Sequence, residues 1–436
     1  MPNGSTSSPL RISFQTLGCR LNQSETASIQ NSFEANGFEV VDFDKPFDIV
    51  VINTCTVTEG GDADTRRLVN KANRRNPNVR IALVGCQAQV QKEKLSSMSN
   101  VRWIVGNGMK MDLVSILQQH PDPLETHVIT PTIERQPFSQ PIHSVDREHT
   151  RANIKIQDGC DFFCSFCEIP YARGRARSRI FEDILLEARA LVAAGHKELI
   201  LTGINIGTYG DQNKTMMDVL KALNELDGLE RIRISSIEPT TIPLDIFNYM
   251  NNSHKLCRYL HIPLQSGSDD VLKEMKRLYS RDEFINFIRQ AHQKIPQICI
   301  GTDVIVGFPG ETDQYFDETV DLIREEPIHY VHVFSYSQRN MAKSRLRGDV
   351  VASHVISKRS GVLRELSSRK RRIFHESMLG TTQTVLFEEF KENCWVGVTD
   401  NYIKVKVQEE ANRNLHNQIL PVKFQKIQGQ YMVGEL

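Results

Sequence analysis

Residues 153–167, NIKIQDGCDFFCSFC, decide the fold and the chemistry that we predict for this chain. NIKIQ predicts a buried strand, and the loop directly after it carries Cys160, Cys164 and Cys167. This C-x3-C-x2-C spacing brings three thiolates within reach of one iron–sulfur cluster. A 4Fe-4S cluster takes four cysteine ligands, so three leave one iron with an open position. A structural zinc site is the alternative, but zinc prefers four closed ligands, and no second cysteine pair lies nearby.

The segment from Ile154 to about Ser337 alternates strand and helix patterns. Its candidate strands are NIKIQ, ELILTG, RIRISSI, RYLHIPL, ICIGTDVIVG and YVHVFSYS. Six strand–helix units are too few for an eight-stranded barrel, so we expect an open, partial β/α barrel. Chemistry in such folds gathers at the carboxyl ends of the strands, where the cysteine loop lies.

The rest of the chain divides into segments with different patterns. Residues 10–119 alternate apolar runs with amphipathic stretches and predict a small parallel α/β domain. Residues 120–149 are rich in proline and have no period, which predicts a linker. Residues 150–377 hold the partial barrel and a basic connector, and residues 378–436 carry five short strands that predict a small all-β barrel. The predicted fold class is therefore α/β with a C-terminal β-barrel.

Cys19, Cys55 and Cys86 each end or directly follow an apolar strand of the first domain. The carboxyl ends of parallel strands meet at one crevice, so we expect these thiols to converge. A second three-cysteine 4Fe-4S cluster is the favoured interpretation, with a zinc site or three unrelated buried cysteines as alternatives. The remaining cysteines are expected to be packing residues: Cys257, Cys299 and Cys394.

The composition indicates a cytoplasmic location and no membrane association. The 436 residues include 53 Lys and Arg against 53 Asp and Glu, so a nucleic-acid partner would need local basic patches. MPNGSTSSPLR has no apolar core of signal-peptide length, and no run reaches the roughly 18–20 apolar residues of a membrane span. In a reducing compartment, the nine cysteines are expected to be metal ligands or buried residues.

Motifs along nearly the whole chain resemble those of the radical SAM methylthiotransferase family. They are LGCRLNQSE, NTCTVT, VGCQAQ, CDFFCSFCEIPYARGRARSR, LTGINIGTYG, SSIEP, HIPLQSGS and GTDVIVGFPGET. The C-terminal barrel resembles that family's small RNA-binding TRAM domain. The resemblance implies two 4Fe-4S clusters, and S-adenosylmethionine as both methyl donor and radical source for inserting CH3–S into a C–H bond. It also implies that both cysteine triplets face one substrate pocket between the first and second domains.

The same resemblance implies a set of cofactor-binding residues at the ends of the central strands. They are Gly203, Gln265, Ser266, Gly267, Asp303, Gly307, Gly310 and Glu311. Glycines there let the backbone lie close to a cofactor, although glycines at strand ends are also ordinary turns. Glu238 is either a contact to cofactor or substrate or a buried structural carboxylate, and His261 is expected to be a hydrogen-bonded core residue.

Family members act on tRNA or on an aspartate of a ribosomal protein, and basic residues favour tRNA here. Arginines follow the cysteine loop, and a second run near the barrel is predicted to bind RNA: Arg369, Lys370, Arg371 and Arg372. A splayed anticodon-loop base is reachable without melting a duplex. Basic runs are also commonly solvated faces without a ligand.

LGCRLNQSE, NTCTVT and SSIEP resemble the enzymes acting on N6-threonylcarbamoyladenosine at tRNA position 37. Reading this anionic group requires a polar or cationic pocket beside the second cluster, for which Arg20 and Asn22 are candidates. The alternatives are the same chemistry on N6-isopentenyladenosine or on the ribosomal aspartate, or a non-catalytic iron–sulfur RNA-binding protein. The enzyme would also need a low-potential electron donor such as flavodoxin or ferredoxin.

Overall fold

The computed structural model describes residues 9–57, 59–140, 150–252, 255–408 and 413–436. Spatial contacts divide the chain into two compact units. Unit 1 comprises Met1–Val145, Asp158–Asp183 and Ser337–Ala342, and unit 2 comprises Asp146–Gln157, Ile184–Tyr336 and Lys343–Leu436. The cysteine loop that we assigned to the central segment thus groups with the N-terminal sheet, as does a six-residue piece from far along the chain.

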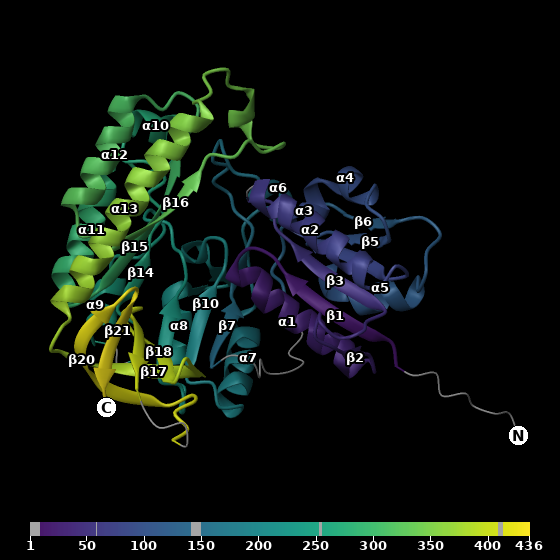
Figure 1. The fold of residues 1–436 in the computed structure, drawn as a ribbon, viewed down its shortest axis with the longest axis horizontal. Helices are drawn as coiled ribbons and strands as arrows, with labels where there is room; N and C mark the ends of the chain where they lie inside the picture. Colours follow the sequence, from purple (N-terminus) through teal and green to yellow (C-terminus); the bar gives the residue numbers. More distant parts are fainter. Residues whose placement is uncertain (1–8, 58, 141–149, 253–254, 409–412) are drawn as a thin grey trace, which may run out of the picture. The chain divides into compact units, whose positions relative to one another are not determined.

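Unit 1 is built on a parallel sheet with the strand order β2-β1-β3-β4-β5-β6 (Figure 1). The strands are β1 (Arg11–Thr16), β2 (Glu39–Val40), β3 (Ile49–Thr54), β4 (Arg80–Gly85), β5 (Val101–Val105) and β6 (His127–Ile129). The helical elements are α1 (Arg20–Ala35), α2 (Glu59–Arg75), α3 (Cys86–Val90), α4 (Lys92–Ser96), η1 (Lys110–Asp112), α5 (Leu113–Gln119) and α6 (Ile169–Arg173).

Apolar side chains cover both faces of this sheet. On one face, Phe33 of α1 packs in a cluster with Val51 and Trp103. On the other face, Val69 of α2 clusters with Val50. Neighbouring residues of β3 point to opposite faces, so its run IVVINT is buried throughout. The predicted parallel α/β domain is confirmed.

The linker predicted over residues 120–149 is wrong in its first part. β6 (His127–Ile129) pairs in parallel with β5 and extends the sheet. A strand of three residues is too short to show a period, which is why the sequence pattern missed it. Residues 141–149 of the predicted linker lie outside the described residues.

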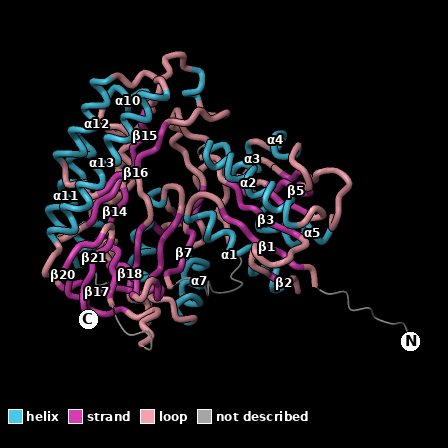
Figure 2. Tube along the Cα trace, in the orientation of Figure 1, coloured by secondary structure: helices cyan, strands magenta, loops and turns pink. Residues whose placement is uncertain are grey.

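Unit 2 contains the predicted six parallel strands, and Figure 2 shows them in magenta with the helices in cyan. They are β7 (Arg151–Lys155), β10 (Glu198–Thr202), β13 (Arg231–Ile234), β14 (Tyr259–His261), β15 (Cys299–Val306) and β16 (Tyr330–Ser335). They form two three-stranded sheets, and the isolated parallel bridges Ile232–Leu256 and Ser236–His261 lie between β13 and β14. This is the open, partial barrel.

Helices alternate with these strands, and short elements fill the connections. The helices are α7 (Phe181–Ala193), α8 (Met216–Asn224), α9 (Ile246–Asn252), α10 (Asp269–Glu274), α11 (Arg281–Lys294), α12 (Asp313–Glu325) and α13 (Ser353–Ser377). The short elements are β8 (Gln157–Asp158), β9 (Arg177–Ser178), β11 (Gly210–Asp211), β12 (Lys214–Thr215), η2 (Ile206–Thr208) and η3 (Lys343–Leu346).

The C-terminal tail forms a closed five-stranded barrel in the order β17-β18-β19-β21-β20, as predicted. Its strands are β17 (Thr382–Lys391), β18 (Cys394–Thr399), β19 (Lys404–Val407), β20 (Ile419–Gln428) and β21 (Tyr431–Glu435).

This barrel packs against the amino ends of the central strands. Tyr259, Cys299 and Tyr330, each the first residue of its strand, share one apolar cluster with barrel residues. Arg233 of β13 is fully buried and donates to the Thr399 and Asp400 carbonyls of the barrel at 3.0 and 2.8 Å. The barrel therefore completes the core of unit 2 at the end opposite to the carboxyl ends of the strands.

Candidate active site

The structure brings Cys19, Cys55 and Cys86 together at one edge of the unit 1 sheet. Cys19 precedes α1, Cys55 directly follows β3, and Cys86 directly follows β4. The strands β1, β3 and β4 are neighbours, so their carboxyl ends lie side by side. Burial raises the pKa of the Cys55 thiol to about 12, and the nearby Cys86 and Cys19 add to the shift. Such thiols stay protonated at neutral pH unless a metal takes the proton's place.

Gly18 lets the backbone pass close to this group. Its φ is +89°, and a Cβ added there would lie 2.7 Å from the Cys55 Sγ. A side chain at this position would therefore displace the thiol as well as strain the backbone.

In the second cysteine set, backbone N–H groups point at the thiols. The Phe162 N–H donates to the Cys160 Sγ at 3.5 Å, and the Ile169 N–H donates to the Cys167 Sγ at 3.4 Å. Hydrogen bonds of this kind favour the thiolate form that binds iron.

Arg173 fastens the cysteine loop to the first helix of unit 1. This guanidinium is fully buried and donates to both carboxylate oxygens of Glu25 at 3.0 Å, to Asn22 at 2.6 Å and to Asp158 at 3.0 Å. Burial opposes the charge of Arg173, but its anionic neighbours outweigh that effect and raise its pKa. Lys110 also donates to Glu25 at 2.5 Å, and Arg177 donates to Asp158 at 3.1 Å, so three cations surround the two buried carboxylates of this network.

Two further contacts tie the loop to the cysteine edge of the sheet. The Asn107 side-chain amide donates to the Ala172 carbonyl at 2.7 Å and lies 3.5 Å from the Cys86 Sγ. The Thr56 hydroxyl donates to Glu168 at 2.8 Å, which joins the residue after Cys55 to the residue after Cys167. Both cysteine triplets therefore belong to one hydrogen-bonded assembly.

Arg20 and Asn22, which we proposed as contacts for the N6 substituent of the substrate, lie at the start of α1. Asn22 is buried, and its side chain donates to the Leu17 and Thr54 carbonyls and accepts from Arg173. These bonds use its polar atoms within the protein. Arg20 is the first residue of the helix.

The predicted cofactor-binding residues lie in unit 2, mostly at the carboxyl ends of its strands. Gln265 has a φ of +66°, and its N–H donates to the Asp303 carbonyl at 2.8 Å. Glu311 accepts from the Gly307 N–H at 3.1 Å and from Arg359 at 2.5 Å. Burial raises the pKa of Glu311. Arg359, which is buried and also donates to Asp313 at 2.7 Å, is thus a structural residue.

Protein atoms lie close to all four of the predicted glycines. A Cβ at Gly203, Gly267, Gly307 or Gly310 would lie 2.7 Å or less from Ile206, Thr319, Ile356 or Asp349, respectively. Packing alone therefore accounts for glycine at these positions, and their role in cofactor binding stays a prediction. Ser266 is buried beside Thr319.

Three side chains that face each other on β14, β15 and β16 form a group that sequence reasoning did not assemble. The Asp303 carboxylate lies 3.3 Å from the His261 Nε2 and 3.5 Å from the His332 Nδ1. Burial disfavours the charge of Asp303, but the two imidazoles outweigh it and lower its pKa. Among the described residues, this is the one group of three His, Cys, Asp or Glu side chains whose ligand atoms all lie within 4.8 Å of one another. Nearby, burial raises the pKa of Glu238, which pairs with Arg277.

The predicted RNA-binding run lies at the end of α13 and divides into two kinds of residue. Lys370 donates to the Arg324 and Glu326 carbonyls at 3.1 and 2.7 Å, and Arg371 lies over the Tyr330 ring. Arg369 and Arg372 are exposed, and among the described residues they pair with Glu365 and Glu376 of their own helix. The two exposed arginines remain candidates for RNA contact, whereas the other two stabilise the unit.

Comparison with known proteins identifies the family to which this geometry belongs. The model described as "Radical SAM superfamily" matches residues 154–323, and "Uncharacterized protein family UPF0004" matches residues 11–106. A threonylcarbamoyladenosine tRNA methylthiotransferase, MtaB, from Aquifex aeolicus is 37% identical over 91% of this chain and 96% of its own length. A tRNA-2-methylthio-N(6)-dimethylallyladenosine synthase from Lachnoclostridium phytofermentans is 31% identical over 98% and 96%.

A solved structure supports the same fold. The radical S-adenosylmethionine methyltransferase TsrM from Kitasatospora setae aligns with a TM-score of 0.55 and 13% identity, over 74% of this chain and 72% of that one. The fold and the cysteine loop define a radical SAM enzyme, which uses a 4Fe-4S cluster and S-adenosylmethionine. The chain belongs to the methylthiotransferase family of these enzymes. Within the described residues, no helix has the length and apolar character needed to cross a membrane.

Proposed function

We propose that this enzyme adds CH3–S to C2 of N6-threonylcarbamoyladenosine at position 37 of tRNA. One observation carries the proposal: both cysteine triplets lie in unit 1, and the hydrogen bonds of the buried Arg173 connect the segments that hold them. The substrate rests on the higher identity to the threonylcarbamoyladenosine enzyme, 37% against 31% for the dimethylallyladenosine synthase.

The donor set fits two iron–sulfur clusters. Cys160, Cys164 and Cys167 would hold the first, and Cys19, Cys55 and Cys86 the second. A single zinc ion would hold its thiolates about 3.8 Å apart. In neither of the described cysteine triplets do all three Sγ atoms lie within 4.8 Å of one another. This wider spacing supports iron–sulfur clusters over a single zinc ion. When bound, the first cluster with S-adenosylmethionine supplies a radical able to open an unactivated C–H bond, and the second supplies the sulfur.

The residues of the chain hold this arrangement in place. The Phe162 and Ile169 N–H groups stabilise negative charge on two thiolates of the loop. Arg173 and Glu168 keep the loop against the sheet edge that carries the other triplet. A radical needs its sulfur donor close by, so a rigid connection between the two cysteine sets serves the reaction.

The domain roles and partners follow from the same proposal. Residues 10–119 would carry the second cluster, residues 150–377 the S-adenosylmethionine site, and residues 378–436 part of the RNA surface. A tRNA substrate fits a cytoplasmic location, and the reduction of the first cluster would need an electron donor such as flavodoxin or ferredoxin. Gly203, Gln265 and Asp303 stay candidates for the cofactor pocket.

Nucleoside mass spectrometry of tRNA from cells with and without the protein tests the proposal. The methylthiolated threonylcarbamoyl nucleoside should disappear from the deletion strain and return with the wild-type gene. A methylthiolated isopentenyl nucleoside that follows the gene instead would refute the substrate.

Iron analysis separates the two clusters. Anaerobically reconstituted protein should hold about eight irons per chain, from two clusters of four. Replacing Cys19, Cys55 and Cys86 together should halve the iron and abolish product, while reductive cleavage of S-adenosylmethionine persists. Iron near four in the parent protein would contradict the second cluster.

A further inference from the structure

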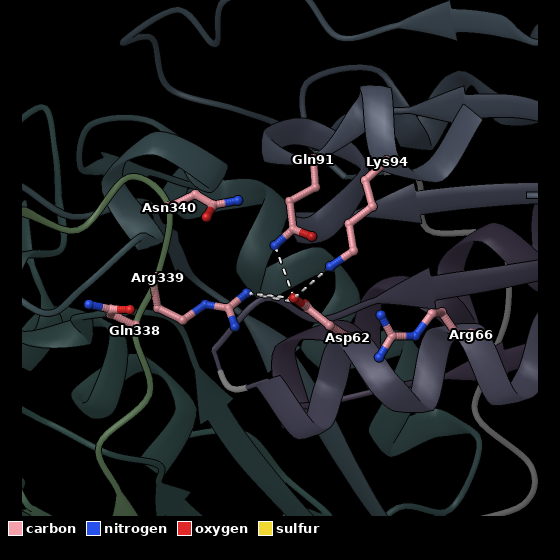
Figure 3. Close-up of a pocket in the computed structure, with 7 residues that line it drawn as sticks. All are labelled: Asp62, Arg66, Gln91, Lys94, Gln338, Arg339 and Asn340. Carbon is pink, nitrogen blue, oxygen red and sulfur yellow. Dashed lines mark hydrogen bonds and ion pairs between the residues drawn. The ribbon is translucent and has the colours of Figure 1, made fainter. Parts of the chain in front are cut away.

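Unit 1 contains a polar pocket. It has a volume of about 290 Å³, close to the lower end of small-molecule sites. Figure 3 shows the seven lining residues: Asp62, Arg66, Gln91, Lys94, Gln338, Arg339 and Asn340. They come from α2, from α4 and the residue before it, and from the segment Ser337–Ala342.

The lining has the chemistry of an anion site. It holds three cations, one carboxylate and three amides, and no apolar side chain. The single carboxylate, Asp62, already accepts from Arg339 at 3.1 Å and from Gln91 at 3.1 Å, and Lys94 lies 3.7 Å away. The exposed Arg66 has no hydrogen-bond or ion-pair partner among the described residues, so its guanidinium is available to a ligand.

The pocket is joined to both cysteine triplets. Arg339, only 4% exposed, reaches Asp62, the Thr56 hydroxyl at 3.2 Å and Glu168 at 3.4 Å. Thr56 directly follows Cys55, and Glu168 directly follows Cys167. A group bound here would lie beside Arg339, whose guanidinium contacts a residue next to each set of ligands.

We infer that this pocket binds the threonylcarbamoyl group of the substrate nucleoside, with its carboxylate facing Arg66 and Lys94. The inference rests on the proposed function. The threonylcarbamoyl group carries one carboxylate, a hydroxyl and a urea-like linkage, which match cations and amides. An isopentenyl group is apolar and would leave these polar groups desolvated and unpaired, which disfavours it. The pocket therefore selects the N6 substituent and supplies the polar site that we had sought at Arg20 and Asn22.

Kinetics with synthetic anticodon stem-loops that differ only in the N6 substituent of adenosine 37 test this assignment. Arg66→Ala and Lys94→Ala should each raise KM for the threonylcarbamoyl stem-loop about tenfold, the loss of one hydrogen bond to a charged group. Arg66→Lys, which keeps the charge, should recover part of the loss. The matched controls are Arg67→Ala, which loses a surface pair with Asp64, and the exposed Lys92→Ala.

Binding of the stem-loop with unmodified adenosine distinguishes a carboxylate from an RNA phosphate. Arg66→Ala should leave that affinity unchanged. An equal weakening of both stem-loops would mean that the pocket holds a backbone phosphate, and it would overturn the inference. Values of KM like those of Arg67→Ala would also overturn it, with the proposed function intact. Inactivity of the wild-type enzyme on the threonylcarbamoyl stem-loop would instead refute the proposed function.

Discussion

Replacement of Arg173 by Met should loosen the cysteine loop from the sheet of unit 1. The change removes four hydrogen bonds: two to Glu25, one to Asp158 and one to Asn22. Methionine fills much of the same volume, so the effect comes mainly from lost charge and hydrogen bonding. Arg173 is fully buried, and its loss removes one positive charge from beside the buried carboxylates of Glu25 and Asp158.

The expected loss of stability depends on which cations remain beside each carboxylate. Glu25 keeps Lys110 at 2.5 Å, and Asp158 keeps Arg177 at 3.1 Å. Four charge-assisted bonds counted separately would give about 6–12 kcal/mol. The remaining cations limit the loss, so we expect about 3–5 kcal/mol, the usual cost of removing one partner from a buried ion pair.

Amide hydrogen exchange on cluster-free protein measures this effect locally. Amides of residues 158–173 should lose protection in Arg173→Met, with iron occupancy falling after reconstitution. Arg175→Met is the matched control, because Arg175 is half exposed and its bond to Asp161 is a surface pair worth about 0–1 kcal/mol. Protection in Arg173→Met equal to that in Arg175→Met would refute the reasoning that the buried network holds the loop.

Three further predictions concern unit 2. Arg233→Met should destabilise the protein by about 3–5 kcal/mol in urea unfolding, because buried Glu198 loses its closest cation. An unchanged unfolding transition would mean that the barrel docks without the help of Arg233. Burial lowers the pKa of His375 from 6.5 to about 4, so the unfolded state binds its proton first as the pH falls. Stability should therefore drop by up to about 1.4 kcal/mol per pH unit between 6.5 and 4, and His375→Gln should flatten this slope relative to the parent in pH-dependent unfolding. Replacing Arg369 and Arg372 by Ala should lower the slope of log tRNA affinity against log salt by roughly 0.7–0.9 per lost phosphate contact, with equal slopes in parent and variant counting against RNA binding at α13.

The barrel contacts also decide which variants are informative. Deleting the tail from Met378 onward would remove the barrel residues that pack on Tyr259 and Tyr330 and leave Arg233 without its carbonyl partners. Such a deletion would destabilise unit 2 itself. Point replacements of exposed arginines test RNA binding without this cost.

Local patterns in the sequence determined most of the fold. Four strands of the first sheet (β1, β3, β4 and β5), all six strands of the partial barrel and the five strands of the C-terminal barrel follow from apolar runs bounded by turn residues. The spacing of Cys160, Cys164 and Cys167, and the placement of Cys19, Cys55 and Cys86 after strands, identified the candidate ligands. These signals lie within a few residues of one another, or repeat at strand ends, so the sequence displays them directly.

The partners of the charged residues depended on tertiary structure. Arg173 meets Glu25 across 148 positions, and Arg339 meets Asp62 across 277. The sequence contains an arginine in each place but no sign that one closes the cysteine loop and the other lines a pocket. The same holds for Lys370 and Arg371, which the sequence grouped with two exposed arginines. Topology alone sets which distant segments meet, and burial then decides whether a charge binds a ligand or holds the protein together.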